Sequence, residues 1–389
     1  MKTIYLDNNA TTRVAPEVLE TLFAYLRDFY GNPSSMHAPG GLAAAKMRQA
    51  RTQAAALLGA EPEEIVFTSC GTESDNTAVL SALKVRPRKR RIVTSSVEHP
   101  AIKALLERFG KEGYEVVELP VDGEGHLDMD AYKRSLSPDT TLVSIMWANN
   151  ETGVIFPVEE AAALAKERGI LFHTDAVQAV GKVPMDMKRN VIDMLSLSGH
   201  KLHAPKGVGV LYVRKGTEFA PFMVGGHQEK GRRAGTENTA GIIGLGKACE
   251  LAAANLEREN GEVRRLRDKL ETRLIELIPG ARVNGGNAPR LPNTSSISFD
   301  SVEAEGILLL LDELGICASS GSACTSGSSE PSHVLKAMGI PFSMAQGSVR
   351  FSLSIYTTEE EVDFVIEKAP AIIAHLRELS APRRAGQGV

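Results

Sequence analysis

Short apolar segments alternate with amphipathic stretches through the first two thirds of this sequence. The apolar segments are bounded by turn residues and predict strands at Ile65–Thr68, Arg91–Ser95, Tyr114–Leu119, Leu142–Trp147, Ile170–Thr174, Met194–Ser198 and Val208–Val213. Helical patterns lie between several of them, at Thr77–Leu83, Ala101–Phe109 and Val158–Arg168. Strands that alternate with helices build βαβ units. The sequence therefore predicts an α/β fold with a mainly parallel central sheet covered on both faces.

The pattern changes after Gly246. A long charged amphipathic helix is followed by a strand at Ser296–Phe299, a helix at Ala304–Leu314 and a strand at Ser348–Leu353. A final helix opens with Thr358 and Glu361, the spacing of a capping box. This order predicts a smaller α+β domain. We expect a large domain at residues 14–257, with residues 1–13 and 258–389 forming the smaller one.

Composition narrows the class of protein. The 389 residues are 43% hydrophobic and carry a net charge of −4, which gives no support to nucleic-acid binding. Four cysteines without close pairs do not make a disulfide framework, which favours a reducing cytosol. The start of the chain does not resemble a signal peptide, and no apolar run approaches the ~20 residues that span a bilayer. We therefore expect a soluble cytoplasmic protein without a membrane or nucleic-acid partner.

Polar side chains follow the predicted strands at the points where the strands end. Because parallel strands end at one edge of a sheet, and ligands of open α/β sheets bind there, these residues form a candidate site. They are Gly71, Thr72, His99, Asn150, Asp175, Gln178, Ser198, His200 and Lys201.

Three of these positions suggest a cofactor. Gly71 and Thr72 open a helix whose free N–H groups suit a phosphate, although a plain helix cap is the commoner use of such residues. Asp175 ends an apolar strand, so it needs a cationic partner such as a protonated pyridine nitrogen; a cap or a structural ion pair is the alternative. Lys201 in a water-poor pocket can form a Schiff base. Together they provide the parts of a pyridoxal-phosphate site.

The other residues at the strand ends can complete that site. His99 can stack on the ring, Asn150 and Gln178 can bind the ring hydroxyl, and Ser198 and His200 can donate to the phosphate. Each residue alone is more often structural, and only their combination indicates the cofactor.

Cys324 lies in an unusual segment, CASSGSACTSGSSEPSH at 317–333. Serine and glycine at this density predict a flexible, exposed loop, whereas a cysteine used for packing is normally buried. Cys324 is therefore the candidate reactive thiol. Cys317 and Cys249 are predicted to be core residues, and packing explains Cys70 better. Arg350 follows in a strand-like run, where it can grip a substrate carboxylate or form an ordinary surface ion pair.

Motifs along nearly the whole chain resemble one enzyme family. They are YLDNNATT (5–12), GNPSS.H (31–37), TSCGTESDN (68–76), VEHPA (97–101), MWANNETG (146–153), FHTDAVQAVGK (172–182), SLSGHKLHAPKGVG (196–209), RRAGTEN (232–238), SSGSACTSGS (319–328), EPSHVL (330–335) and VRFSLS (349–354). In this order they are similar to the pyridoxal-phosphate-dependent cysteine desulfurases of the NifS/IscS group, most of all the nitrogen-fixation NifS type. Ile355 departs from the pattern, because a basic residue often stands there.

The resemblance implies a fold-type I, class-V aminotransferase-like homodimer with active sites near the subunit interface. It implies Lys201 as the Schiff-base lysine, Cys324 as the persulfide-forming cysteine and Arg350 as the ligand of the substrate carboxylate. It also implies His99, Asn150, Asp175, Gln178, Ser198 and His200 around the cofactor, and Thr236 on the phosphate across the dimer. L-Cysteine would become L-alanine, and the sulfur would pass to an iron–sulfur scaffold protein, for nitrogenase maturation in the NifS type. Cys324 is also a candidate ligand of a transient iron–sulfur cluster.

Other functions stay open on the residues alone. An aminotransferase or a selenocysteine lyase on the same scaffold explains Lys201 but gives Cys324 no necessary role. A nicotinamide-dependent dehydrogenase would need G-x-G-x-x-G after the first strand, where TSCGTES stands instead. A non-catalytic assembly partner leaves the residues at the strand ends unexplained.

Overall fold

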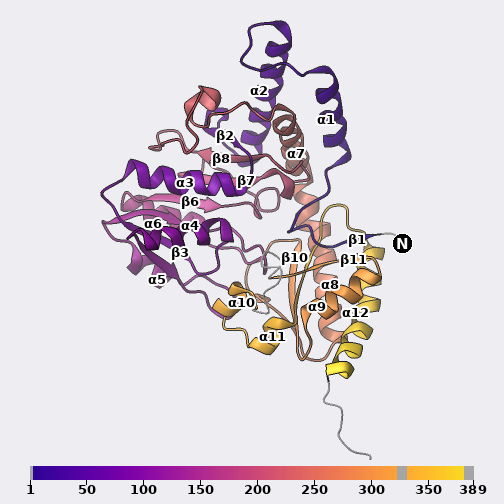
Figure 1. Cartoon of the computed structure of the whole chain (residues 1–389). Helices are drawn as coiled ribbons and strands as arrows, with labels where there is room; N and C mark the ends of the chain where they lie inside the picture. The colour runs from indigo at the N-terminus through magenta and orange to yellow at the C-terminus, as the bar shows by residue number, and fades with distance from the viewer. Residues whose placement is uncertain (1–2, 322–330, 381–389) are drawn as a thin grey trace, which may run out of the picture.

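The computed structural model describes residues 3–321 and 331–380, and its largest element is a seven-stranded sheet (Figure 1). The strand order is β2-β8-β7-β6-β5-β3-β4. The strands are β2 (Ile65–Thr68), β3 (Arg91–Ser95), β4 (Glu115–Leu119), β5 (Thr140–Ser144), β6 (Leu171–Asp175), β7 (Met194–Ser198) and β8 (Gly209–Val213). Only β8 runs antiparallel to its neighbours, so the predicted mainly parallel sheet is confirmed.

One strand leaves the sheet earlier than its sequence predicts. The apolar run suggested a strand at Leu142–Trp147, but β5 covers Thr140–Ser144. The amide of Met146 donates to the carboxylate of Glu98 (3.0 Å) instead of continuing the ladder toward β3. A side-chain acceptor thus replaces the strand partner on the β3 side, while the amide of Trp147 still donates to the carbonyl of Asp175 (2.8 Å) on the β6 side.

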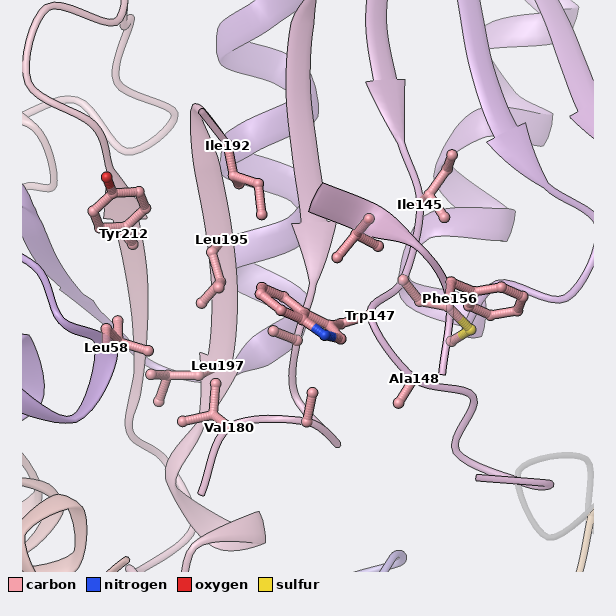
Figure 2. Packing of buried hydrophobic residues seen from close by; sticks show 14 of the residues in the cluster. Leu58, Ile145, Trp147, Ala148, Phe156, Val180, Ile192, Leu195, Leu197 and Tyr212 are labelled. Carbon is pink, nitrogen blue, oxygen red and sulfur yellow. The ribbon is translucent and has the colours of Figure 1, made fainter. Parts of the chain in front are cut away.

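Helices cover the central sheet on both faces. α3 (Gly71–Val85) and α4 (Pro100–Lys111) pack on one face, against Val66 and Ile92. The other face is covered mainly by α2 (Ala38–Leu58), α5 (Met129–Ser135), α6 (Val158–Glu167) and α7 (Thr239–Arg258). Figure 2 shows part of this second core, where Trp147 lies beside Leu195 of β7 and near Phe156. Burial of one such side chain stabilises the fold by roughly 1.5–3 kcal/mol, so the sheet is a rigid base for its polar edge.

A second, smaller sheet has the strand order β12-β13-β10-β9 and is antiparallel throughout. Its strands are β9 (Ala281–Val283), β10 (Thr294–Phe299), β12 (Ser319–Ser320) and β13 (Ser348–Ser352). α8 (Arg264–Leu277), α9 (Ala304–Glu313) and α12 (Glu359–Ser380) share a separate apolar core with it (Figure 1). Thr358 and Glu361 form the predicted capping box, each backbone N–H donating to the other's side chain.

The start of the chain joins this smaller unit. β1 (Ile4–Tyr5) pairs in parallel with β11 (Ile316–Cys317), and Asp7 bridges to Ser352 of β13. The long helix predicted after Gly246 is two helices, α7 and α8, joined by a π-helical turn at Glu259–Val263. The domain boundaries at 13/14 and 257/258 stay a prediction, which the separate apolar core of the smaller unit supports.

The remaining helices complete the description. They are α1 (Pro16–Asp28), α10 (His333–Ala337) and α11 (Phe342–Gln346). Within residues 3–321 and 331–380, no helix combines the length and the apolar composition needed to cross a membrane.

Candidate active site

A cavity of about 360 Å³ lies at the carboxyl ends of the parallel strands. Its volume is in the range of sites for small molecules and cofactors. Ten of the twelve predicted site residues line it, namely Gly71, Thr72, His99, Asn150, Asp175, Gln178, Ser198, His200, Lys201 and Arg350. Segments far apart in the sequence therefore bring the predicted residues to one place, as the strand-end pattern suggested.

The other two predicted residues are not part of this wall. Cys324 lies outside the described residues. Thr236 is exposed and does not line the cavity of its own chain. Of the remaining cysteines, Cys249 is buried as predicted, and Cys317 is only half-buried in β11, so its assignment to the core is wrong. The cause is that β11 pairs on one side only, with β1.

Lys201 is positioned by the end of β7. The strand stops at Ser198, and the single helical turn Gly199–Lys201 aims the lysine at the cavity. Its amine donates to the backbone carbonyls of Asn9 and Ala10, at 2.7 Å for Ala10. Carbonyl partners hold an amine without supplying a charge of opposite sign. The N-terminal segment thus orients the lysine at the cavity.

Asp175 is a buried acid in the wall of the cavity. The side chain is 6% exposed, and its Oδ1 accepts from the amide of Val177 (2.9 Å). Burial raises the pKa of the Asp175 carboxyl, and the nearby His99 and Lys201 partly offset that rise. A cation placed against this carboxyl would restore its ionised form.

Two further buried acids lie close to Asp175. Burial and the charge of Asp175 raise the pKa of Asp75 well above its usual value. Burial also raises the pKa of Glu98 to about 8, although Ser95 and the amide of Met146 both donate to it. Burial thus favours the neutral form of both acids. Asp175 differs from them because His99 and Lys201 lower its pKa, so it is the acid best placed to pair with a cation in the cavity.

The ring of His99 faces the cavity in a defined tautomer. Its Nδ1 accepts from the amide of Ala101 (3.2 Å), so the proton of the neutral ring lies on Nε2. Burial lowers the pKa of His99, and the charge of Lys201 lowers it further, against the opposing effect of Asp175. A neutral, flat imidazole is suited to stacking on an aromatic ring.

An anion would fit at the start of α3. The helix begins at Gly71, where a Cβ atom would come 2.8 Å from Cγ2 of Val177. Only glycine allows this close approach, which brings the first N–H groups of the helix to the cavity wall. Ser198 and His200 line the same cavity. Burial lowers the pKa of His200 to about 4, so it acts as a neutral hydrogen-bonding group.

Three buried polar atoms of residues that line the cavity have no hydrogen-bond partner among the described residues. One is Oδ1 of Asp75, and the other two belong to residues that can meet a ligand. They are Oε1 of Gln178 and Nε of Arg350. Gln178 uses its other end to donate to the carbonyl of Asn9 (3.0 Å). Arg350 uses its other two nitrogens for Asp7 (2.8 Å) and the carbonyl of Asn150 (3.0 Å). A buried unpaired polar atom costs about 1–3 kcal/mol, so these atoms indicate a polar ligand.

Several residues of the site were not singled out from the sequence. Asn9, Ala10, Asp75 and Gly321 also line the cavity. Asn9 and Ala10 lie in a polar run directly after a short apolar segment, the same signal that identified the other strand ends. Within the described residues, no group of three potential ligands for a metal ion occurs.

Known proteins resemble this chain along nearly its whole length. Residues 4–365 match the family model for class-V aminotransferases. The chain is 58% identical to a cysteine desulfurase of Trichormus azollae, over 98% of this chain and 95% of that protein. It is 57% identical to the cysteine desulfurase NifS of Azotobacter vinelandii, over 100% of this chain and 96% of that protein.

Solved structures agree with these matches. A NifS-like protein of known structure has a TM-score of 0.90 and 40% identity, and the match covers 96% of this chain and 100% of the other. A structure described as SspA in complex with cysteine has a TM-score of 0.81 and 35% identity, with 92% and 100% covered. The fold is therefore shared with proteins whose sequences are also related.

Proposed function

Because this chain belongs to the class-V aminotransferase family and is a pyridoxal-phosphate-dependent cysteine desulfurase, we propose that the cavity at its strand ends is where L-cysteine loses its sulfur. One observation supports this assignment most strongly. A single cavity contains Lys201, Asp175 and Arg350, and its wall includes Gly321, which precedes Cys324 by three residues. Pyridoxal phosphate, when bound, withdraws electrons from the Cα atom of an amino acid.

The cavity residues divide into groups by what they can bind. Asp175 pairs with the ring nitrogen, since it is the buried acid best able to ionise beside a cation. The start of α3 and the side chains of Ser198 and His200 bind the phosphate. The free Oε1 of Gln178, with Asn150, binds the ring hydroxyl, and the neutral ring of His99 stacks on the cofactor.

Lys201 has two roles in this proposal. With the cofactor bound, its amine would be the group that bonds to the cofactor aldehyde, and the released amine would be the base for the Cα proton of the substrate. The carbonyls of Asn9 and Ala10 accept from the amine and so hold it at the cavity while it is not bonded to the cofactor.

Arg350 binds the carboxylate of the substrate. Its Nε is buried and has no partner among the described residues, and Asp7 accepts from another nitrogen of the guanidinium. An arginine that is fixed in this way offers its buried Nε–H to a carboxylate oxygen with little loss of entropy.

Cys324 receives the sulfur. Its thiolate attacks the sulfur of the substrate, the bond between Cβ and sulfur breaks, and L-alanine leaves after the carbon has taken up a proton. The sulfur stays on Cys324 as a persulfide. Three residues of chain reach at most roughly 11 Å, so Cys324 stays within reach of the cavity wall at Gly321.

The chain should act as a homodimer. Large apolar side chains are exposed on α1, on α2 and between them, including Phe23, Leu26, Tyr30 and Met36. Clustered apolar exposure of this kind marks an interaction surface. A second copy covering this surface would also give Thr236 a role, as a donor to the phosphate in the partner's cavity. The acceptor of the persulfide sulfur is an iron–sulfur scaffold protein, and nitrogenase maturation is the use that the NifS-type relative supports.

Formation of L-alanine tests the proposed activity. Purified chain loaded with pyridoxal phosphate should convert L-cysteine to equal amounts of L-alanine and sulfide when dithiothreitol is present. Pyruvate in place of L-alanine would identify an elimination and would contradict the proposal. Comparison with L-selenocysteine, which needs no attacking thiol, separates a desulfurase from a selenocysteine lyase.

Asp175→Asn should slow the removal of the Cα proton by about 100-fold. The amide can still accept from the N–H of Val177, so the fold persists, but it cannot hold a ring nitrogen protonated. Exchange of the Cα proton of L-alanine in heavy water measures this step without any sulfur chemistry. Asp193→Asn is the matched control, because Asp193 is also buried but accepts from Phe172 at the opposite ends of the strands. Equal exchange rates in the two variants would remove Asp175 from the mechanism.

A further inference from the structure

Glu151 is a buried carboxyl that does not line the cavity. It lies in the turn after β5 and is 4% exposed. The side chain of Asn149 fixes its backbone by accepting from the amides of Glu151 (2.9 Å) and Thr152 (3.0 Å). Burial raises the pKa of Glu151 to about 7, and a hydroxyl of Ser332 and the charge of Arg350 oppose that rise. Burial of a carboxyl is unfavourable unless it has hydrogen-bond partners, so the neighbours of Glu151 indicate what it does.

The first partner is Ser332. Its hydroxyl donates to Oε2 of Glu151 and also accepts from the amide of Val334 (3.0 Å), which caps α10. His333 adds a second hydrogen bond next to Ser332, between its Nε2 and the carbonyl of Glu98 (3.0 Å). The chain that follows the segment 322–330 is thus fastened to the residues around the cavity.

The second neighbour is Gly321. β12 pairs with β13 opposite Arg350 and Val349 and delivers Gly321 to the cavity wall. A Cβ atom on Gly321 would overlap Oε2 of Glu151 and would lie 3.3 Å from Cβ of Ser332. The same carboxylate oxygen therefore touches the residue before the segment 322–330 and a residue just after it.

We propose that Glu151 is a positioning residue that holds together the two ends of the segment that carries Cys324. This inference rests on the proposed function, because it concerns how the thiol reaches the substrate sulfur. Fixing both ends at one carboxyl limits the positions that the intervening chain can adopt. A misplacement of about 1 Å between reacting groups can cost about 100-fold in rate, so the contact has a large effect on sulfur transfer.

The test compares two steps of the reaction in the same variants. In Glu151→Ala, L-alanine formation from L-cysteine should fall by about 100-fold, while Cα-proton exchange of L-alanine stays within about twofold, since Lys201 and Asp175 are untouched. Glu151→Gln should recover at least about tenfold, because its amide oxygen still accepts from Ser332. Ser332→Ala should slow L-alanine formation less in the Glu151→Ala background than in wild type, because the contact between the two side chains is already lost there. The loss of the α10 cap accompanies Ser332→Ala in both backgrounds and so cancels from this comparison.

Glu64→Ala is the matched control for loss of a buried acid. Glu64 is 8% exposed and accepts from backbone amides of Glu61 and Lys215 at the far ends of the strands. It should change both steps little. A parallel fall of exchange and desulfuration in Glu151→Ala would show a distorted cofactor site and overturn the inference, as would an unchanged desulfuration rate. Failure of the proposed function is distinguishable, because then Cys324→Ala would itself retain desulfuration.

Discussion

Lys201→Ala should abolish turnover, with a fall of at least about 10⁴-fold, because the variant loses both the covalent bond to the cofactor and the acceptor of the Cα proton. Lys182 does not replace the amine, because its own Nζ is buried and donates to the carbonyl of Gln178 (3.2 Å). In wild-type protein, borohydride treatment followed by peptide mass spectrometry should place the cofactor on the peptide that contains Lys201.

Lys201→Arg separates the loss of the reactive amine from a loss of structure. The alanine variant also removes the contacts to Asn9 and Ala10, and a fall in activity could then reflect a disordered N-terminal segment. Arginine can still donate to both carbonyls but cannot bond to the aldehyde, so it should be equally inactive and as resistant to thermal unfolding as wild type. Lys206→Ala, five residues further along and exposed, should stay active. Turnover by Lys201→Arg within tenfold of wild type would refute the assignment of this lysine.

The position of Lys201 was predictable because apolar runs mark where strands stop. β2, β3 and β7 have the bounds that the pattern predicts, so Gly71 and Lys201 fall at strand ends as expected. All residues of β7 are buried, so the first residues that can reach the polar edge of the sheet are Ser198 and those that follow it. Local pattern and tertiary structure agree for these three strands, whereas β5 ends before its apolar run does.

The role of the N-terminal segment was not predictable from local pattern. Asn9 and Lys201 are 192 residues apart in the sequence, and they meet because β1 pairs with β11 and Asp7 bridges to Ser352. Hydrophobic periodicity carries no information about such pairings. Glu151 was missed for the same reason, since its partner Ser332 is 181 residues away.

The burial and the pKa shifts of the acids near Asp175 could not be predicted from the sequence either. Asp75 lies one helical turn after Gly71. An aspartate at such a position is usually exposed, yet Asp75 is only 1% exposed. Its raised pKa follows from burial and from Asp175, both of which depend on the folded structure. Residue types identified the chemistry of the site, whereas the directions in which the pKa values of its acids shift follow from packing.

Cys324→Ala should separate the steps of the reaction at the point where sulfur moves. Cα-proton exchange of L-alanine should continue at the wild-type rate, because Lys201, Asp175 and Arg350 remain. L-Alanine formation from L-cysteine should fall by at least about 10³-fold, the scale of loss when a nucleophile is removed. Cys317→Ala, in the same segment of the sequence but paired in β11, should keep both activities.

The persulfide itself locates the acceptor thiol. Wild-type protein given L-cysteine without reductant should gain the mass of one sulfur atom on the peptide that contains Cys324, and dithiothreitol should remove it. The peptides with Cys70 and Cys249 should stay unchanged; burial raises the pKa of Cys249 to about 12, so its thiolate is scarce at neutral pH. An aminotransferase on this fold would show no sulfur on any cysteine and no loss in Cys324→Ala. Sulfur found on another cysteine, or L-alanine made by Cys324→Ala at the wild-type rate, would refute the mechanism, because Cys324 would then not be the thiol that takes up the sulfur.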